Sequence, residues 1–353
     1  MDPVSRFDGW IPIRVYAAAS GYRVDWCYFG TRRLTEPFFR DSVQNALQEP
    51  FNVAFRQDTA IDALLEWAQV RPGIEPTAFI FHTSRCGSTL LSRMLMALES
   101  HVVASEPPLL DAVLRAHLST PALPADVQAA WVRATISGLA QRRVGNESRF
   151  VVKLDGWSIV DLPLMRRAYP DVPWIFLYRD PLEVAMSQFK MPGAYMVPGV
   201  IGPSVARIST DEPIVMPREE FIARVLGRIF EAGLEGCRSA GGRPVHYREL
   251  PEALWATLAG DFGVATDAAT IATLRDAARP DAKNPYFEFV RDSEQKQRAS
   301  SEVLRRAVDR WVAPAYASLE ALRDTRADPR TKSPVPAPAA AGFSPVTTAS
   351  VRS

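Results

Sequence analysis

The stretch AFIFHTSRCGSTLLSRML, from Ala78 to Leu95, decides the fold class of this chain. It opens with four consecutive apolar residues, 78–81, a pattern typical of a strand buried on both faces. After a polar loop at 82–87, apolar residues recur three and four positions apart, which indicates a helix that begins at Ser88. The sequence therefore predicts a strand, a loop and a helix in immediate succession, as in an α/β fold.

The loop between this strand and helix has the composition of an anion-binding site. The N–H groups of the first helical turn have no partner within the helix, and they form the positive end of the helix dipole. Gly87 lets the backbone approach a phosphate closely, Ser88 and Thr89 add hydroxyl donors, and Arg85 adds a permanent positive charge. We therefore expect a phosphate group to bind here. A strand, turn and helix without a ligand is the alternative interpretation.

The composition is that of a globular protein without a strong overall charge. The chain has 353 residues, 47% of them apolar and 23% charged, and its net charge is +1. This balance does not indicate binding to nucleic acid or to an anionic membrane, so an anion site has to be local. Three cysteines far apart in the sequence predict neither a disulfide framework nor a metal site. No apolar run approaches the ~20 residues of a membrane span, and the start has no signal-peptide pattern, so a cytoplasmic location is expected.

Three regions are predicted along the chain. Residues 1–72 form a β-rich accessory segment, in which runs 11–16 and 22–29 alternate like the strands of a hairpin and 61–70 has helical spacing. Capping of the main sheet and contacts within a homodimer are both open as roles for it. Residues 73–324 form the α/β domain, with long helices predicted at 127–144, 218–237 and 301–323. The tail 325–353 is rich in Pro, Ala, Ser and Thr, so we expect it to be disordered.

Polar residues follow two further predicted strands of the α/β domain. Strand 101–105 leads into Glu106, and strand 149–153 ends with Lys153 and is followed by Asp155. Ligands of open α/β sheets bind at the carboxyl ends of the strands. Glu106, Lys153 and Asp155 are therefore candidate site residues, while a surface role is the alternative for each.

The most strand-like run, 172–178, leads into a second motif. Arg179 leaves the strand as a cation, Asp180 and Pro181 start a helix, and Ser187 lies two turns into that helix. The loop 190–217 that follows is dense in Pro and Gly but also contains apolar residues. Because long loops in compact domains are usually functional or disordered, we interpret it as a lid or an acceptor-binding loop.

Both motifs resemble those of one enzyme family. The run Arg85-Cys86-Gly87-Ser88-Thr89 resembles the 5′-phosphosulfate loop of the bacterial-type sulfotransferases that use 3′-phosphoadenosine 5′-phosphosulfate (PAPS). It departs from the Walker A motif of kinases, because His82 stands at the first glycine position and no lysine follows Gly87. The segment from Arg179 to Ser187, about 90 residues downstream, resembles the 3′-phosphate site of the same family.

The resemblance implies a P-loop-type three-layer α/β fold with a central, mainly parallel sheet. It also implies transfer of a sulfuryl group from PAPS to a hydroxyl of a small molecule or carbohydrate, with adenosine 3′,5′-bisphosphate as product and no metal required. Within a Ser-Glu-Pro run, Glu106 would accept the acceptor's proton, and Arg85 would stabilise charge on the leaving phosphate. Lys153 would contact the sulfuryl group or act as general acid. The remaining implied contacts are Arg179, Ser187, Lys283 and Asn284 with the nucleotide and Asp155 with the acceptor. His82, which borders the phosphate loop, is a further candidate for contact with the nucleotide or the acceptor, and a histidine whose hydrogen bonds are satisfied within the loop is the alternative.

Two rival functions stay open. A P-loop kinase of a small molecule would use Asp155 as a magnesium ligand, although the missing Walker lysine counts against it. A non-catalytic protein that binds a nucleotide would keep the pocket alone. The sequence identifies neither the acceptor nor which of Glu106 and Asp155 is the base.

Overall fold

The computed structural model describes residues 7–200, 216–279 and 300–327. Lys283 and Asn284, two of the expected nucleotide contacts, lie outside the described residues. So do positions 201–215 of the expected acceptor loop and positions 328–353 of the expected tail.

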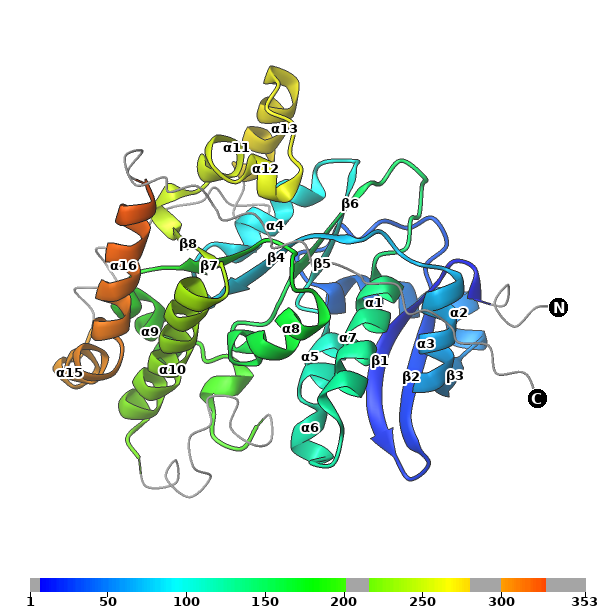
Figure 1. The fold of residues 1–353 in the computed structure, drawn as a ribbon, viewed down its shortest axis with the longest axis horizontal. Helices are drawn as coiled ribbons and strands as arrows, with labels where there is room; N and C mark the ends of the chain where they lie inside the picture. The colour runs from blue at the N-terminus through cyan, green and yellow to red at the C-terminus, as the bar shows by residue number, and fades with distance from the viewer. Residues whose placement is uncertain (1–6, 201–215, 280–299, 328–353) are drawn as a thin grey trace, which may run out of the picture.

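A five-stranded parallel sheet forms the centre of the molecule (Figure 1), which confirms the expected α/β class. The strand order is β5-β6-β4-β7-β8. The strands are β4 (Pro76–His82), β5 (His101–Ser105), β6 (Arg149–Lys153), β7 (Trp174–Tyr178) and β8 (Arg243–His246). The chain goes from β4 to β5 and β6 on one side and then crosses to β7 and β8 on the other. This order makes the carboxyl end of β4 a topological switch point, the place where open α/β sheets bind ligands.

Helices cover both faces of the sheet, giving three layers. Alternate residues of β4 point to opposite faces, with Ala78 and Ile80 in one buried cluster and Phe79 and Phe81 in the other. The first face carries α4 (Ser88–Met96), α11 (Ala253–Ala256), α12 (Ala259–Phe262) and α13 (Ala268–Ala278). The second face carries α5 (Pro108–Leu114), α7 (Ala125–Leu139), α8 (Leu162–Ala168), α9 (Pro181–Lys190), α10 (Arg218–Ser239), α15 (Glu302–Trp311) and α16 (Ala313–Ala327). Among the described residues, no helix is long and apolar enough to cross a membrane.

The N-terminal region forms a separate antiparallel sheet of β1 (Trp10–Ala18), β2 (Gly21–Tyr28) and β3 (Gln57–Ala60). The hairpin of β1 and β2 was expected, but β3 was not, because the polar run QDTA carries no strand pattern. Three helices accompany the sheet, α1 (Phe39–Leu47), α2 (Pro50–Ala54) and α3 (Ile61–Val70). β1 packs on α5 and α3 packs on α7, so this region shares the larger hydrophobic core of the α/β sheet.

Two helices differ from their predicted ranges. The helix expected at 127–144 ends at Leu139, because the Glu147 carboxylate accepts the N–H groups of residues 143–145 and holds them in a turn. The helix expected at 301–323 is two helices, α15 and α16, and α16 continues to Ala327, so the expected disorder of 325–353 is wrong for residues 325–327. The two helices meet around Val312, and Pro314, which cannot continue a helix from the preceding turn, lies in the first turn of α16.

Candidate functional site

The loop 82–87 connects β4 to α4 through an unusual backbone path. Ser84, Arg85 and Gly87 all have positive φ angles, of 61°, 52° and 84°. Positive φ in a residue other than glycine costs energy and is found mostly at functional sites. The path ends at Ser88, where α4 begins, so the free N–H groups of its first turn lie at the loop. This backbone path is compatible with the anion site that the sequence predicts.

Gly87 is required for two reasons. Its φ of 84° lies in the left-handed region, and a Cβ atom added there would come 2.7 Å from Cδ2 of Tyr247. Tyr247 follows β8, in a region to which the sequence analysis gave no role. Its ring lies against the phosphate loop and beneath Arg179, whose guanidinium carbon is 4.5 Å from the ring centroid. Tyr247 therefore links the two predicted phosphate motifs.

Two buried side chains fix the loop on the sheet. His82 Nδ1 accepts a hydrogen bond from the Ser84 amide at 2.9 Å, and its Nε2 lies 2.9 Å from the carbonyl oxygen of Leu154. Cys86 donates its thiol hydrogen to the carbonyl oxygen of Leu177 at 3.3 Å. Cys86 is fully buried, so it acts as a small anchor of the loop between β4 and β7.

The hydrogen bonds of His82 define its protonation state in this conformation. Burial lowers the pKa of His82, whereas contacts with Cys86 and Glu106 raise it, with a net rise to about 9. A protonated Nδ1 has no lone pair, however, so it could not accept the Ser84 amide hydrogen. We therefore assign the neutral ring with its proton on Nε2, because the loop conformation requires Nδ1 as an acceptor.

Glu106 and Lys153 form an ion pair at the ends of β5 and β6. Lys153 Nζ lies 2.9 Å from Glu106 Oε1, and the lysine side chain has no exposed surface. Glu106 has a φ of 52°, and its amide donates to the Lys153 carbonyl at 2.7 Å, so the strand end itself turns the carboxylate toward the lysine. Burial opposes ionisation of Glu106, but the Lys153 ammonium and His82 lower its pKa to about 2. The carboxylate is therefore ionised at neutral pH.

The Lys153 ammonium retains donor capacity. Although Nζ lies 2.9 Å from Glu106 Oε1, it donates no aligned hydrogen bond to any of the described residues. A buried ammonium with unused N–H groups is well suited to receive the oxygens of a bound anion.

The pKa of Asp155 is shifted in the opposite direction from that of Glu106. Burial raises the pKa of the Asp155 carboxyl well above its usual range, and the negative charges of Glu106 and Asp111 add to this rise. One carboxyl group with a raised pKa and one with a lowered pKa thus lie near Lys153. Pairs of acids whose pKa values are pushed apart are typical of sites that move protons.

Arg179, the expected 3′-phosphate ligand, is already paired. It is buried, and its Nε lies 2.5 Å from Oε2 of Glu183, one turn into α9. Asp180 caps α9 by accepting the Glu183 amide at 3.0 Å. Ser187 lies half-buried on the second turn of the same helix, as expected. A phosphate that binds Arg179 would share it with Glu183.

The segment after α9 lies against the phosphate loop. Arg85 donates to the carbonyl oxygen of Met191 at 3.0 Å, and Gln188 donates to the Ser84 hydroxyl at 3.3 Å and to the Tyr195 hydroxyl at 2.8 Å. The start of the predicted acceptor loop, from residue 191, is thereby held beside the phosphate loop.

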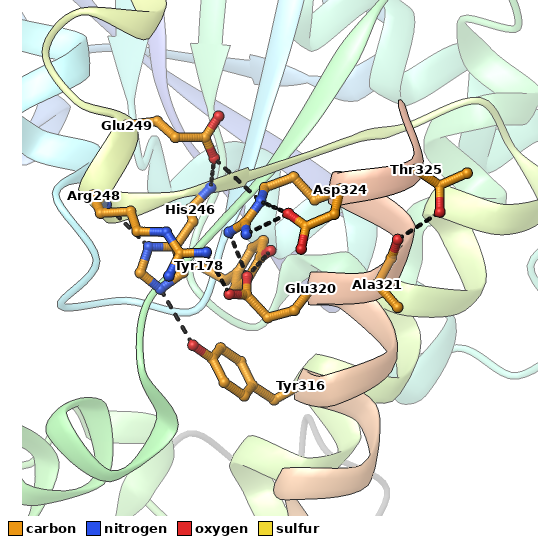
Figure 2. Close-up of polar contacts among 10 residues, drawn as sticks. Tyr178, His246, Arg248, Glu249, Tyr316, Glu320, Ala321, Asp324 and Thr325 are labelled. Atoms are coloured by element: carbon orange, nitrogen blue, oxygen red, sulfur yellow. Dashed lines mark hydrogen bonds and ion pairs between the residues drawn. The ribbon is translucent and has the colours of Figure 1, made fainter. Parts of the chain in front are cut away.

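A cluster of polar residues joins α16 to the carboxyl ends of β7 and β8 (Figure 2). The Glu320 carboxylate accepts from the Tyr178 hydroxyl at 2.6 Å and from Arg248 at 2.7 Å, and it also pairs with Arg323. Burial lowers the pKa of His246, the β8 residue of this cluster, to about 4, so its ring is neutral. No local sequence pattern indicates this cluster, because its members come from three distant segments. It fixes the strand end from which Arg179 emerges.

The fold brings most of the expected site residues to one edge of the sheet. Those at the carboxyl ends of β4, β5 and β6 or in the first turn of α4 are His82, Arg85, Cys86, Gly87, Ser88, Thr89, Glu106, Lys153 and Asp155. Arg179 and Ser187 follow the neighbouring strand β7. In the part of the chain that the structure describes, no group of three or more His, Cys, Asp or Glu side chains is placed to bind a metal.

No family model and no curated protein matches this chain. Three solved structures that are similar to it are sulfotransferases. That of Alicyclobacillus acidocaldarius is 18% identical, with a TM-score of 0.39 over 71% of this chain and 96% of its own. That of Mycobacterium avium is 11% identical, with a TM-score of 0.40 over 70% and 81%. The sulfotransferase domain of the Synechococcus olefin synthase is 17% identical, with a TM-score of 0.36 over 72% and 96%. The chain is thus similar in structure to bacterial sulfotransferases over about 70% of its length.

Proposed function

We propose that this protein is a sulfotransferase that moves the sulfuryl group of PAPS to a hydroxyl of a small molecule or carbohydrate. The observation that carries the proposal is the meeting of two phosphate motifs at one sheet edge. The loop around Gly87 and the loop at Arg179 follow the neighbouring strands β4 and β7, and Tyr247 contacts both. Two separated anion sites suit a nucleotide with phosphates at both its 5′ and 3′ positions.

In the proposed reaction, the bond between sulfur and the 5′-phosphate oxygen breaks, and a bond between sulfur and the acceptor oxygen forms. The acceptor's proton goes to a carboxylate of the site. The N–H groups at the start of α4 and the Arg85 guanidinium stabilise the negative charge that grows on the departing phosphate. Adenosine 3′,5′-bisphosphate and the sulfate ester are released.

Lys153 couples sulfuryl binding to proton transfer. In the structure, its ammonium holds the pKa of Glu106 at about 2, where the carboxylate is a weak base. When the unused N–H groups of Lys153 bond to sulfuryl oxygens, less of its charge acts on Glu106, and the pKa of that carboxylate rises. We therefore assign Glu106 as the base, with Asp155 as the alternative.

The test is formation of adenosine 3′,5′-bisphosphate from PAPS with a panel of alcohols, followed by chromatography. The wild type should form it only in the presence of an accepted alcohol, and Lys153→Met and Glu106→Gln should each reduce the rate at least about a hundredfold. Full activity in Glu106→Gln would remove the base assignment. Magnesium-dependent formation of ADP from ATP would replace the proposal with a small-molecule kinase, and nucleotide binding without turnover of either would indicate a binding protein.

A further inference from the structure

The N-terminal region reaches into the proposed site through Phe38. The ring of Phe38 lies over the Lys153 ammonium, with Nζ 4.9 Å from the ring centroid. This residue belongs to the accessory segment, not to the α/β domain that supplies Glu106 and Lys153. An aromatic face next to a buried ammonium is an attractive contact, which strengthens as water is removed.

Residues before and after Phe38 in the sequence hold it in place. On one side, Arg33 donates to the carbonyl oxygens of Leu98, Met96 and His101 in the turn between α4 and β5. On the other side, Phe39 is 2% exposed and belongs to the larger core, and it begins α1. The 33–39 segment is therefore held by α4 and β5, at the ends of these elements opposite the phosphate loop and Glu106, and by the larger core at Phe39.

Phe38 itself is only half-buried. One part of its ring covers Lys153, which has no exposed surface, while the Glu106 side chain that pairs with this lysine is 24% exposed. A molecule that brings a hydroxyl to the accessible carboxylate would therefore lie next to the remaining face of the ring.

A second half-buried aromatic ring, Trp157, follows Lys153 and Asp155 at the end of β6. Trp157 comes two residues after Asp155, is half-buried, and donates its indole N–H to Asp111 at 2.7 Å. Its ring packs on Tyr195, with the centroids 4.8 Å apart, at the start of the predicted acceptor loop. Aromatic rings that flank a few fixed polar groups are typical of sites for flat apolar ligands.

We infer that Phe38 forms a wall of the acceptor site and selects an alcohol carried on a flat, apolar ring, such as a phenol or naphthol. The inference rests on the proposed function and deepens it. The hydroxyl lies at Glu106, and the ring of the acceptor packs on Phe38. The accessory segment then completes the site instead of only supporting the fold.

The test is calorimetric titration with 2-naphthol of protein saturated with adenosine 3′,5′-bisphosphate. We expect Phe38→Ala to weaken 2-naphthol binding about tenfold or more, whereas Phe38→Tyr, which keeps the ring, stays within about twofold of the wild type. The matched control is Phe51→Ala, because Phe51 lies in the same segment but is 45% exposed and packs on Tyr28, away from Lys153. Glucose at the same concentration should not displace 2-naphthol.

Three results would overturn the inference. These are no binding of 2-naphthol to the wild type, equal binding to Phe38→Ala, and displacement by glucose. Binding of adenosine 3′,5′-bisphosphate should be the same in Phe38→Ala as in the wild type, which also reports that the variant is folded. The 2-naphthol titration is also carried out without nucleotide. If the protein does not bind adenosine 3′,5′-bisphosphate, the proposed function is contradicted, and the titration without nucleotide still tests whether Phe38 contributes to 2-naphthol binding.

Discussion

Separating the buried ion pair of Glu106 and Lys153 should cost stability as well as activity. The fall in the pKa of Glu106 from its ordinary 4.5 to about 2 corresponds to about 3 kcal/mol of stabilisation of the carboxylate form. Burial opposes this shift and the contacts with Lys153 and His82 more than offset it, with Lys153 the larger favourable contributor. Because coupling energies of contacting residues are about 0.5–3 kcal/mol, we expect about 2 kcal/mol for this buried pair. Because the folded pKa is the lower one, this stabilisation is complete above about pH 4.5 and is lost as the pH falls toward 2.

The assay is a double-mutant cycle by urea unfolding at pH 7. Glu106→Gln leaves a buried ammonium without its partner, and Lys153→Met leaves a largely buried carboxylate, so each should lower the free energy of unfolding by about 2–4 kcal/mol. The double variant should be about 2 kcal/mol more stable than the sum of the two effects implies. The surface pair Arg228 and Glu231 is the control, because both side chains are more than half exposed at the same kind of distance, 3.0 Å. Its coupling should stay below about 0.5 kcal/mol.

Additive effects of Glu106→Gln and Lys153→Met would refute this reasoning. They would show that the two side chains do not interact in the folded protein. Lys153 could then not control the pKa of Glu106, and the proposed coupling of sulfuryl binding to proton transfer would be wrong.

Three further predictions follow from the same geometry. Gly87→Ala should abolish nucleotide binding and should destabilise the protein more than Gly145→Ala does. Both glycines have a positive φ, but of these two only Gly87 has another atom within 4 Å of an added Cβ. Thermal melting of the two variants measures the difference in stability. Asp155→Asn should flatten the decrease in the free energy of unfolding as the pH rises above about 4, the ordinary pKa of an aspartate, because a carboxyl with a raised folded pKa favours folding below that pH and opposes it as the pH rises. Urea unfolding at a series of pH values from about 4 to 8 measures this slope, and an unchanged slope would contradict the prediction. Tyr178→Phe should cost about 1.5–3 kcal/mol by removing the hydrogen bond to Glu320 while keeping the buried ring, and an effect below 0.5 kcal/mol in urea unfolding would show that this bond contributes little.

The sequence alone was sufficient for the parallel α/β core and for the loop at its centre. The apolar run 78–81 and the helical spacing after Ser88 are local patterns, and both elements form where they predict. Glu106 and Lys153 could be predicted to lie close together because each stands at the carboxyl end of a predicted parallel strand, and these ends meet at one edge of the sheet. The short strand β3 escaped prediction because its four residues have no apolar alternation and pair only at the edge of the small sheet.

What could not be predicted depends on contacts between distant segments. The ring of Phe38 over Lys153 joins residues more than 100 positions apart, and Tyr247 meets Gly87 across a still longer separation. No periodicity or spacing encodes such contacts, because they arise from how the layers pack. The pairing of Arg179 with Glu183 is different. Glu183 lies four residues after Arg179, in the first turn of α9, so this spacing is visible in the sequence. The sequence does not show whether Arg179 pairs with this carboxylate or with a phosphate.

The central claim is that the site selects a nucleotide with a 3′-phosphate, and calorimetric titration tests it most directly. Adenosine 3′,5′-bisphosphate, 5′-AMP and ATP are titrated into the wild type, into Arg179→Ala and into the surface control Arg228→Ala. We expect adenosine 3′,5′-bisphosphate to bind more tightly than 5′-AMP and ATP, and only Arg179→Ala to weaken its binding, by about tenfold or more. Equal or tighter binding of ATP, or unchanged binding in Arg179→Ala, would contradict it.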